Sequence, residues 1–171
     1  MGRRAAVTVS LNHLVMQGGG AAKPADRSGR ATSPTPFERH MASLYADVDR
    51  AIAARDPVCT NRGHCCRFGE YGHRLFVTDV ELQYFLSGVD RTAPSPGEDR
   101  CPYQLGGICT ARDRRPLGCR VFFCDPNAQS WQPALYESGL RKLRDIGGRF
   151  GIGYRYREWL SALAFPDGSS R

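Results

Sequence analysis

The chain has 171 residues, of which 41% are hydrophobic, and this is enough for one domain with a core of its own. No apolar run reaches the length of a membrane-spanning helix, so we expect no membrane association. The formal net charge is +7, but residues 1–40 carry +4 of it. Because no recognition helix or set of stacking aromatic residues accompanies this charge, the sequence does not favour a nucleic-acid partner.

Residues 1–34 are rich in Gly, Ala, Ser, Pro and Arg and have too few apolar residues to bury much surface. We therefore expect a flexible tail. No convincing export signal is present in it, since Asn12 and His13 interrupt its one apolar stretch. The sequence thus favours a cytoplasmic protein.

A helix is predicted to begin directly after this tail. Thr35 is a suitable N-cap, Pro36 suits the first helical position, and Glu38 completes a capping box. Apolar residues then recur at helical spacing, at Phe37, Met41, Leu44, Tyr45, Val48 and Ile52. The helix is expected to run to about residue 55, where an Asp-Pro pair ends it.

The region after the first cysteines is predicted to hold a short strand, His73–Val77, followed by a short helix that Gly88 ends. Thr78 and Glu81 form a second capping box at the start of that helix. Asp79 and Glu81 resemble catalytic carboxylates, but helix capping explains both of them.

The second half of the chain is predicted to contain loops, a helix, a short strand and a terminal helix. Residues 88–100 form a loop, and Cys101–Cys124 is expected to be largely irregular. A helix is predicted to begin at Pro133 and to stop at Gly147-Gly148. Tyr154 and Tyr156 then alternate as in a short strand, before a terminal helix with apolar positions Trp159, Leu160 and Leu163.

These elements predict a mainly α fold with short β segments, a small α+β domain. Its centre would be an irregular cysteine-rich metal-binding core packed by three to four helices. We expect a single domain over residues 35–165 and a flexible C-terminus over residues 166–171.

The cysteines carry the strongest functional signal. All seven lie between residues 59 and 124, in two groups with spacings C-x5-C-C and C-x7-C-x9-C-x4-C: Cys59, Cys65, Cys66, Cys101, Cys109, Cys119 and Cys124. Thiols gathered at short spacings are the ligands of soft metals and iron–sulfur clusters. An odd number cannot pair off completely as disulfides, and inert buried thiols explain one or two cysteines, not seven. We therefore predict that all seven belong to a metal-binding site.

Several arginines lie close to these cysteines in the sequence. A cation beside a thiol favours the thiolate that binds metal, and arginines can offset the negative charge of a thiolate-bound centre. We single out Arg115 and Arg120 as cofactor-binding residues that donate to sulfur or to loop carbonyls, with Pro116 fixing the backbone between them. The alternative is that they are ordinary solvent-facing arginines.

The order of these motifs resembles a known family. The segment Cys59-Thr-Asn-Arg-Gly-His-Cys-Cys-Arg, the later Cys101-Pro and Gly107-Ile-Cys109, and the run Arg115-Pro-Leu-Gly-Cys119-Arg-Val-Phe resemble the YkgJ-like cysteine-cluster proteins, which are putative zinc- or iron-chelating domains. The resemblance covers about residues 56–125 and implies metal binding. Arg62 stands where that family has a second cysteine, and His64, His73 or Asp125 could replace the missing ligand.

The expected cofactor is an iron–sulfur cluster or a zinc or iron ion bound by thiolates. The expected role is electron transfer, metal handling or assistance to a partner enzyme, with a partner protein implied. A structural zinc module for protein–protein interaction and a cluster-dependent oxidoreductase are the alternatives. The sequence contains no Ser-His-Asp grouping, no phosphate-binding loop and no H-E-x-x-H motif, so enzymatic activity is left open.

We predict that the tail is dispensable, because its composition cannot support a core and the first capping box begins after it. A shortened protein that starts at Ser33 is expected to keep the metal content and the thermal transition of the full chain. Metal analysis and calorimetry of both proteins test this. A lower transition temperature in the shortened protein would show that the tail contributes to the fold.

Overall fold

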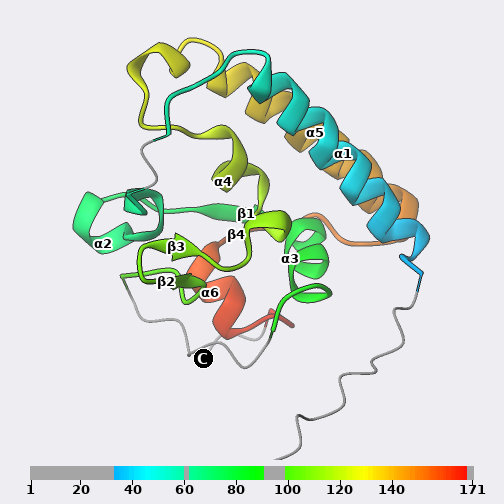
Figure 1. Ribbon diagram of the computed structural model, residues 1–171. Coiled ribbons are helices and arrows are strands. Elements are labelled where there is room, and N and C mark those ends of the chain that lie inside the picture. The colour runs from blue at the N-terminus through cyan, green and yellow to red at the C-terminus, as the bar shows by residue number, and fades with distance from the viewer. Residues whose placement is uncertain (1–32, 60–61, 91–98, 169–171) are drawn as a thin grey trace, which may run out of the picture. The chain divides into compact units, whose positions relative to one another are not determined.

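The computed structural model describes residues 33–59, 62–90 and 99–168 (Figure 1). The unit Ser33–Arg171 is compact. The predicted tail, residues 1–34, lies outside the described residues except for its last two positions. The predicted C-terminal tail is described as far as Gly168, and the Pro166 carbonyl accepts a hydrogen bond from Arg157 at 3.1 Å. The predicted domain limits stay predictions.

Two long helices, α1 (Pro36–Ala53) and α5 (Gln132–Phe150), lie side by side (Figure 1). The predicted capping box of α1 is confirmed, because the Thr35 hydroxyl accepts from the Glu38 amide at 3.2 Å and Glu38 accepts from the Thr35 amide at 2.9 Å. The short helix α4 (Leu117–Val121) packs against both. Their apolar faces form a first core cluster.

Helix α3 (Asp79–Leu86) separates this cluster from a second one. Val80 and Tyr84 pack in the first cluster, whereas Leu82 and Phe85 pack in the second. The second cluster also contains Trp159, which is 1% exposed. A helix with apolar residues on opposite faces is expected to be buried between two layers, and this is the position of α3.

The second cluster is built from short elements. Strand β1 (Phe76–Thr78) pairs antiparallel with β4 (Tyr156–Glu158), and α6 (Trp159–Ala164) follows β4 directly. Strands β2 (Gln104–Leu105) and β3 (Ile108–Cys109) form a hairpin, and α2 (Phe68–Tyr71) follows the first cysteines.

The predicted fold class is confirmed: the protein is mainly α, with short antiparallel strands. Two local predictions need correction. The strand predicted at His73–Val77 begins later, at Phe76, because only residues 76–78 face β4. The segment Cys101–Cys124, predicted to be largely irregular, contains the β2–β3 hairpin and α4.

The predicted stop of the last long helix at Gly147-Gly148 is wrong, since α5 continues to Phe150 and ends at Gly151, which has a φ of 67°. Gly147 instead allows a close approach of α3. A Cβ atom at this position would lie 3.0 Å from Val80 Cγ2. Gly147 therefore marks a packing contact, not a helix end.

Glu81 joins α3 to α4. It is 1% exposed, and its carboxylate accepts hydrogen bonds from the Thr78 amide at 2.8 Å, the Thr78 hydroxyl at 2.9 Å and the Leu117 amide at 2.8 Å. Burial raises the pKa of this carboxyl group. The predicted capping role of Glu81 is confirmed, but Leu117, the first residue of α4, is an additional partner.

Capping does not account for Asp79. Its carboxylate accepts from Arg155 Nε at 2.6 Å and from Arg157 Nε at 3.1 Å. These bonds tie the start of α3 to β4 and to the segment before it. The interpretation of Asp79 as a residue used only for capping is therefore wrong.

Within the described residues, no helix combines the length and the apolar character needed to cross a bilayer.

We predict that Glu81→Ala lowers the free energy of unfolding by about 3 kcal/mol, because it leaves the buried Leu117 and Thr78 amides without acceptors. Glu38→Ala removes the same capping-box group at the more exposed start of α1 and is expected to cost about 1 kcal/mol. Urea unfolding of both variants measures the difference. Equal losses would contradict the role given to the Glu81–Leu117 bond.

Candidate metal centre

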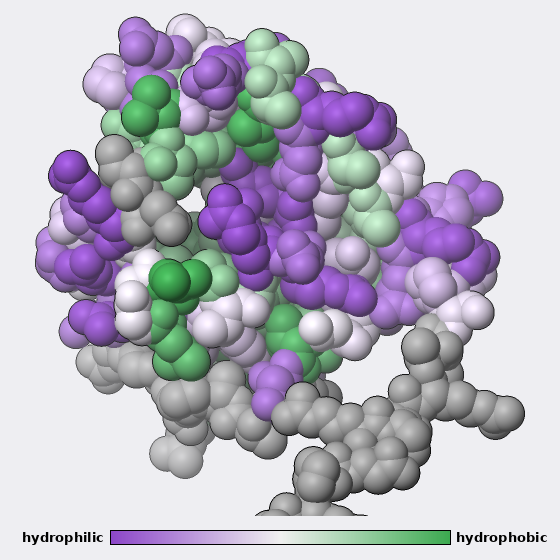
Figure 2. Space-filling model, viewed as in Figure 1, coloured by the Kyte–Doolittle hydropathy of each residue, from purple (hydrophilic) through white to green (hydrophobic). Residues whose placement is uncertain are grey.

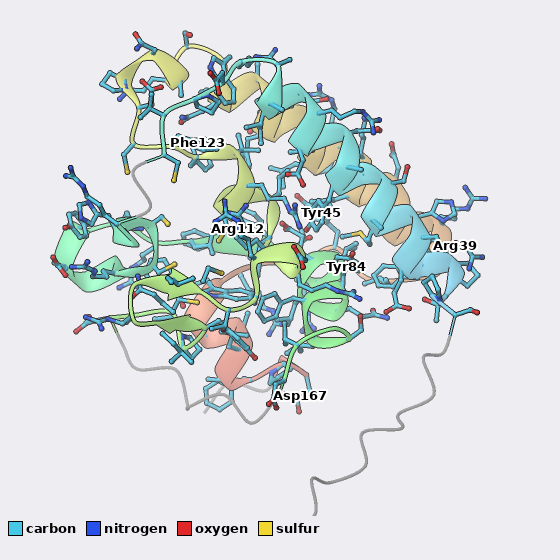
Figure 3. The ribbon with its side chains drawn as sticks, in the orientation of Figure 1. Arg39, Tyr45, Tyr84, Arg112, Phe123 and Asp167 are labelled. Atoms are coloured by element: carbon cyan, nitrogen blue, oxygen red, sulfur yellow. The ribbon has the colours of Figure 1, made fainter. Side chains whose placement is uncertain are left out.

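All seven cysteines line a single cavity of about 370 Å³. They are free thiols that come from five separate parts of the chain. Figure 2 shows the surface hollowed at this place, and Figure 3 shows Arg112 beside the sulfur atoms gathered on this side of the molecule. The structure therefore brings together every cysteine that the sequence predicted as a ligand.

The inner part of the cavity joins the two cysteine groups. Cys65 and Cys66 lie in a 3₁₀ turn, His64–Cys66, with their sulfur atoms 4.0 Å apart. The Cys101 amide donates to the Cys66 carbonyl at 2.9 Å. A backbone hydrogen bond thus fixes the first group against the second, so thiols separated by residues 67–100 face the same space.

Gly63 makes this junction possible. Its φ of 68° lies in the left-handed region, and its carbonyl accepts from the buried Gln104 side chain at 2.7 Å. A Cβ atom here would lie 2.1 Å from Gln104 Nε2. The position therefore requires glycine for its backbone conformation and for the close approach of Gln104.

Cys109 and Cys119 also line the cavity. Cys109 ends β3, and Cys119 lies in the first turn of α4. Since the α4 start is held by the Leu117–Glu81 bond, the position of Cys119 depends on α3. Both thiols have a raised pKa, chiefly because burial disfavours the thiolate.

Cys59 and Cys124 are exposed and lie at the edge of the cavity. Their segments are tied together next to them, because the Val58 amide donates to Asp125 Oδ2 at 3.0 Å. Asp125 also accepts from the Asn127 amide at 2.9 Å, as the cap of a 3₁₀ turn. Together with Cys65, these two cysteines are the exposed thiols of the cavity.

The pKa values of two thiols, Cys65 and Cys101, are lowered, and this favours their thiolate forms. A hydrogen bond from Cys66 lowers the pKa of Cys65 to about 6, and the charge of Arg115 adds to this. The pKa of Cys101 is lowered to about 7, because the single S–H of Cys66 can be donated to Cys101 in place of Cys65 and because the Trp159 indole Nε1 donates to Cys101 Sγ at 3.4 Å. The pKa of Cys66 itself is raised in consequence.

The two arginines singled out from the sequence have different positions. Arg115 lines the cavity and donates to the carbonyls of Arg112 at 3.1 Å and Cys119 at 3.2 Å. The sequence predicted that Arg115 donates either to sulfur or to loop carbonyls, and the structure contains the bonds to loop carbonyls. Its charge acts on Cys65, Cys109 and Cys119.

Arg120 does not line the cavity, and it is 5% exposed, so the solvent-facing interpretation is wrong for this residue. It donates to Asp49 Oδ2 at 2.6 Å, to the Arg115 carbonyl at 2.8 Å and to the Asp113 carbonyl at 2.5 Å. Its guanidinium also lies 4.2 Å from the centre of the Tyr45 ring. Arg120 therefore fixes the loop that carries Arg115 and has no contact of its own with sulfur among the described residues.

Three residues were predicted as replacements for the family cysteine at the Arg62 position. His64 and Asp125 line the cavity, whereas His73 does not. The His64 ring stacks on Tyr71 with 4.3 Å between ring centres, and His73 Nε2 lies 3.3 Å from the Cys65 carbonyl. His64 and Asp125 are thus the two that the structure places among the thiols.

Trp159 is a site residue that the sequence did not indicate. It was predicted only as an apolar position of the terminal helix, and its distance in sequence from Cys101 gives no sign of their hydrogen bond. Its position at the start of α6 follows from the pairing of β4 with β1, because the Trp159 amide donates to the Leu75 carbonyl at 2.8 Å.

The thiols line the cavity, but within the described residues they are not close enough to one another to bind a single ion. Four thiolates around one zinc ion, each at about 2.3 Å, lie about 3.8 Å from one another. Among the described residues, Cys65 and Cys66 approach this distance, but no three Cys, His, Asp or Glu side chains are gathered closely enough to hold a single ion. The thiol donor set is of the kind that binds soft metals and iron–sulfur clusters.

No protein family, curated protein or solved structure matches this chain.

We predict that iodoacetamide modifies Cys65 before Cys109 in the metal-free protein at pH 7, because only thiolates react and the Cys65 pKa is lowered while the Cys109 pKa is raised. The rate at Cys65 is expected to be half-maximal near pH 6 and the rate at Cys109 to rise still at pH 9. Tandem mass spectrometry of the labelled peptides measures both. Arg115→Gln should move the Cys65 profile to higher pH, and identical profiles for the two cysteines would refute the assignment.

Proposed function

We propose that this chain is an iron–sulfur protein that holds its cluster through thiolates of the cavity and carries electrons to or from a partner protein. The observation that carries this proposal is the convergence of all seven thiols on one cavity of about 370 Å³. The sequence motifs further support membership of the YkgJ-like family. When bound, an iron–sulfur cluster supplies reversible one-electron oxidation and reduction.

The spread of the thiols supports a cluster over a single ion. The thiols of residues 65, 66, 101, 109 and 119 come from the 3₁₀ turn, from the segment before β2, from the end of β3 and from α4, and all of them line the cavity. Four thiolates on one zinc ion lie about 3.8 Å apart, whereas the thiolate ligands of a polynuclear cluster are spaced more widely. Seven thiols are more than the four that a cluster needs, so three of the thiols are then free for exchange or for a partner, and Cys59 and Cys124 are two exposed candidates.

The charge of the lining supports an anionic occupant. Arg62, Arg112 and Arg115 line the cavity, and among the described residues none of the three pairs with a carboxylate. Asp125, the lining carboxylate among the residues that the structure describes, accepts from two backbone amides. A cluster held by four thiolates is a net anion, so it would find compensating charge here.

The chain also offers means of tuning the reduction potential. The Trp159 indole donates to Cys101 sulfur, and hydrogen bonds to ligand sulfur stabilise the reduced, more negative state. Apolar rings of Phe68, Phe85 and Tyr103 line the inner wall and keep water from it.

The close approach of Cys65 and Cys66, at 4.0 Å, favours a second candidate, a structural zinc site that presents a protein-binding surface. A zinc site of this kind would use the vicinal pair and two further thiols. For either candidate, we propose a cytoplasmic location, where seven free thiols stay reduced.

Purification without oxygen separates the two candidates. The iron–sulfur proposal predicts a brown protein with visible absorption and with iron and acid-labile sulfide in comparable amounts. Colourless protein with stoichiometric zinc and no sulfide would overturn it in favour of the structural zinc module.

We predict that Cys65→Ser and Cys119→Ser each remove most of the metal and also lower the thermal transition, because metal binding in such sites is coupled to folding. Val48→Thr is the control, since Val48 is buried in the first core cluster, away from the cavity. It should lower stability but leave the metal content unchanged. Full metal content in either cysteine variant would contradict the ligand assignment.

A further inference from the structure

The rim of the thiol cavity exposes large apolar side chains. Val58 is 66% exposed and Phe122 is 48% exposed, and both line the cavity. Leu105 and Ile108, at 57% and 61%, are cross-strand partners in the hairpin that also carries the lining residue Gly107. Figure 2 shows hydrophobic side chains next to the opening. Exposed apolar groups gathered around one opening are typical of an interaction surface.

The same rim carries two arginines that no carboxylate of the described residues pairs with. Arg62 and Arg112 are exposed and line the cavity, and no carboxylate pairs with them in the described part of the chain. Elsewhere arginines do pair, such as Arg67 with Glu70 and Arg114 with Glu38. An apolar patch with unpaired arginines beside it is complementary to an acidic surface.

The cavity reaches the surface at this rim, because Cys59 and Cys124 are exposed thiols that line it. A cluster bound by the thiols would therefore lie close to a protein seated on the rim. Electron tunnelling slows steeply with distance, so this is the face from which transfer would be fast.

We propose that this rim is the docking surface of an acidic electron-carrier protein, and this rests on the iron–sulfur function proposed above. One electron passes from the reduced carrier to the oxidised cluster, or in reverse, so that one centre is oxidised and the other reduced while no covalent bond changes. The apolar residues bind the carrier briefly, and Arg62 and Arg112 steer its approach.

The test uses the cluster-loaded full chain and plant-type ferredoxin, an acidic one-electron carrier, as the probe. The reduction potential of the cluster is measured first. Ferredoxin then serves as electron donor if its own potential is lower, and as acceptor if it is higher. Stopped-flow absorption gives the second-order rate constant of electron transfer. The rate is expected to fall as ionic strength rises, since screening weakens steering. With cytochrome c, a basic carrier, the rate should instead rise with ionic strength.

The variant Arg62→Gln/Arg112→Gln should lower the ferredoxin rate about tenfold at low salt, with the rate expressed per bound cluster and the cluster content of each preparation measured by its visible absorption. Arg141→Gln/Arg149→Gln is the matched control on α5; both arginines are exposed and neither lines the cavity, so its rate should be unchanged. Ile108→Ser tests the apolar part and should lower the rate at all salt concentrations.

A ferredoxin rate that is independent of salt, or equal losses in the rim and α5 variants, would overturn the docking proposal while leaving the cluster assignment intact. If the rim arginine variant loses its cluster, the salt dependence of the unchanged protein and the Ile108→Ser rate decide the question. Binding of a labelled oligothymidylate that the rim variant abolishes would reassign the surface to nucleic acid. A protein that binds zinc alone would overturn both proposals.

Discussion

Glu81 accepts three hydrogen bonds in a fully buried position, and these bonds hold together parts of the chain that are far apart in sequence. A buried carboxylate is costly unless its oxygens are well paired, so the geometry around it has little freedom. Thr78 ends β1 and Leu117 begins α4. Through this one side chain, the β1–β4 pair, α3 and the helix that carries Cys119 are placed relative to one another.

A second junction completes the cavity on its other side. The Cys101 amide bonds to the Cys66 carbonyl, and Gln104 bonds to the Gly63 carbonyl. Hydrogen bonds that do not involve sulfur thus fix the backbone around both cysteine groups, so that all seven cysteines line one cavity. Arg120 extends this framework from the core, since its bonds to the Arg115 and Asp113 carbonyls fix the loop that carries Arg115 to the cavity.

Local patterns in the sequence predicted a large part of the fold. The two capping boxes, at Thr35 and Thr78, depend on residues three apart, and both form as expected. The apolar periodicity of α1 likewise identifies its buried face. Cysteine spacing identified the candidate ligands. These features could be predicted because each depends on the intrinsic geometry of a short segment.

Only the tertiary structure decided how the candidates are arranged. The sequence alone determined that α1 exists, that α3 begins at a capped threonine, and that seven cysteines lie in two groups. The sequence could not determine that Gly147 lies inside α5 and packs closely against α3, because this packing depends on Val80 of that other helix. Nor could it separate Arg115, at the cavity, from Arg120, in the core, although they are five residues apart. Their partners, and the Trp159 bond to Cys101, come from distant segments, and long-range packing around the Glu81 junction brings those segments together.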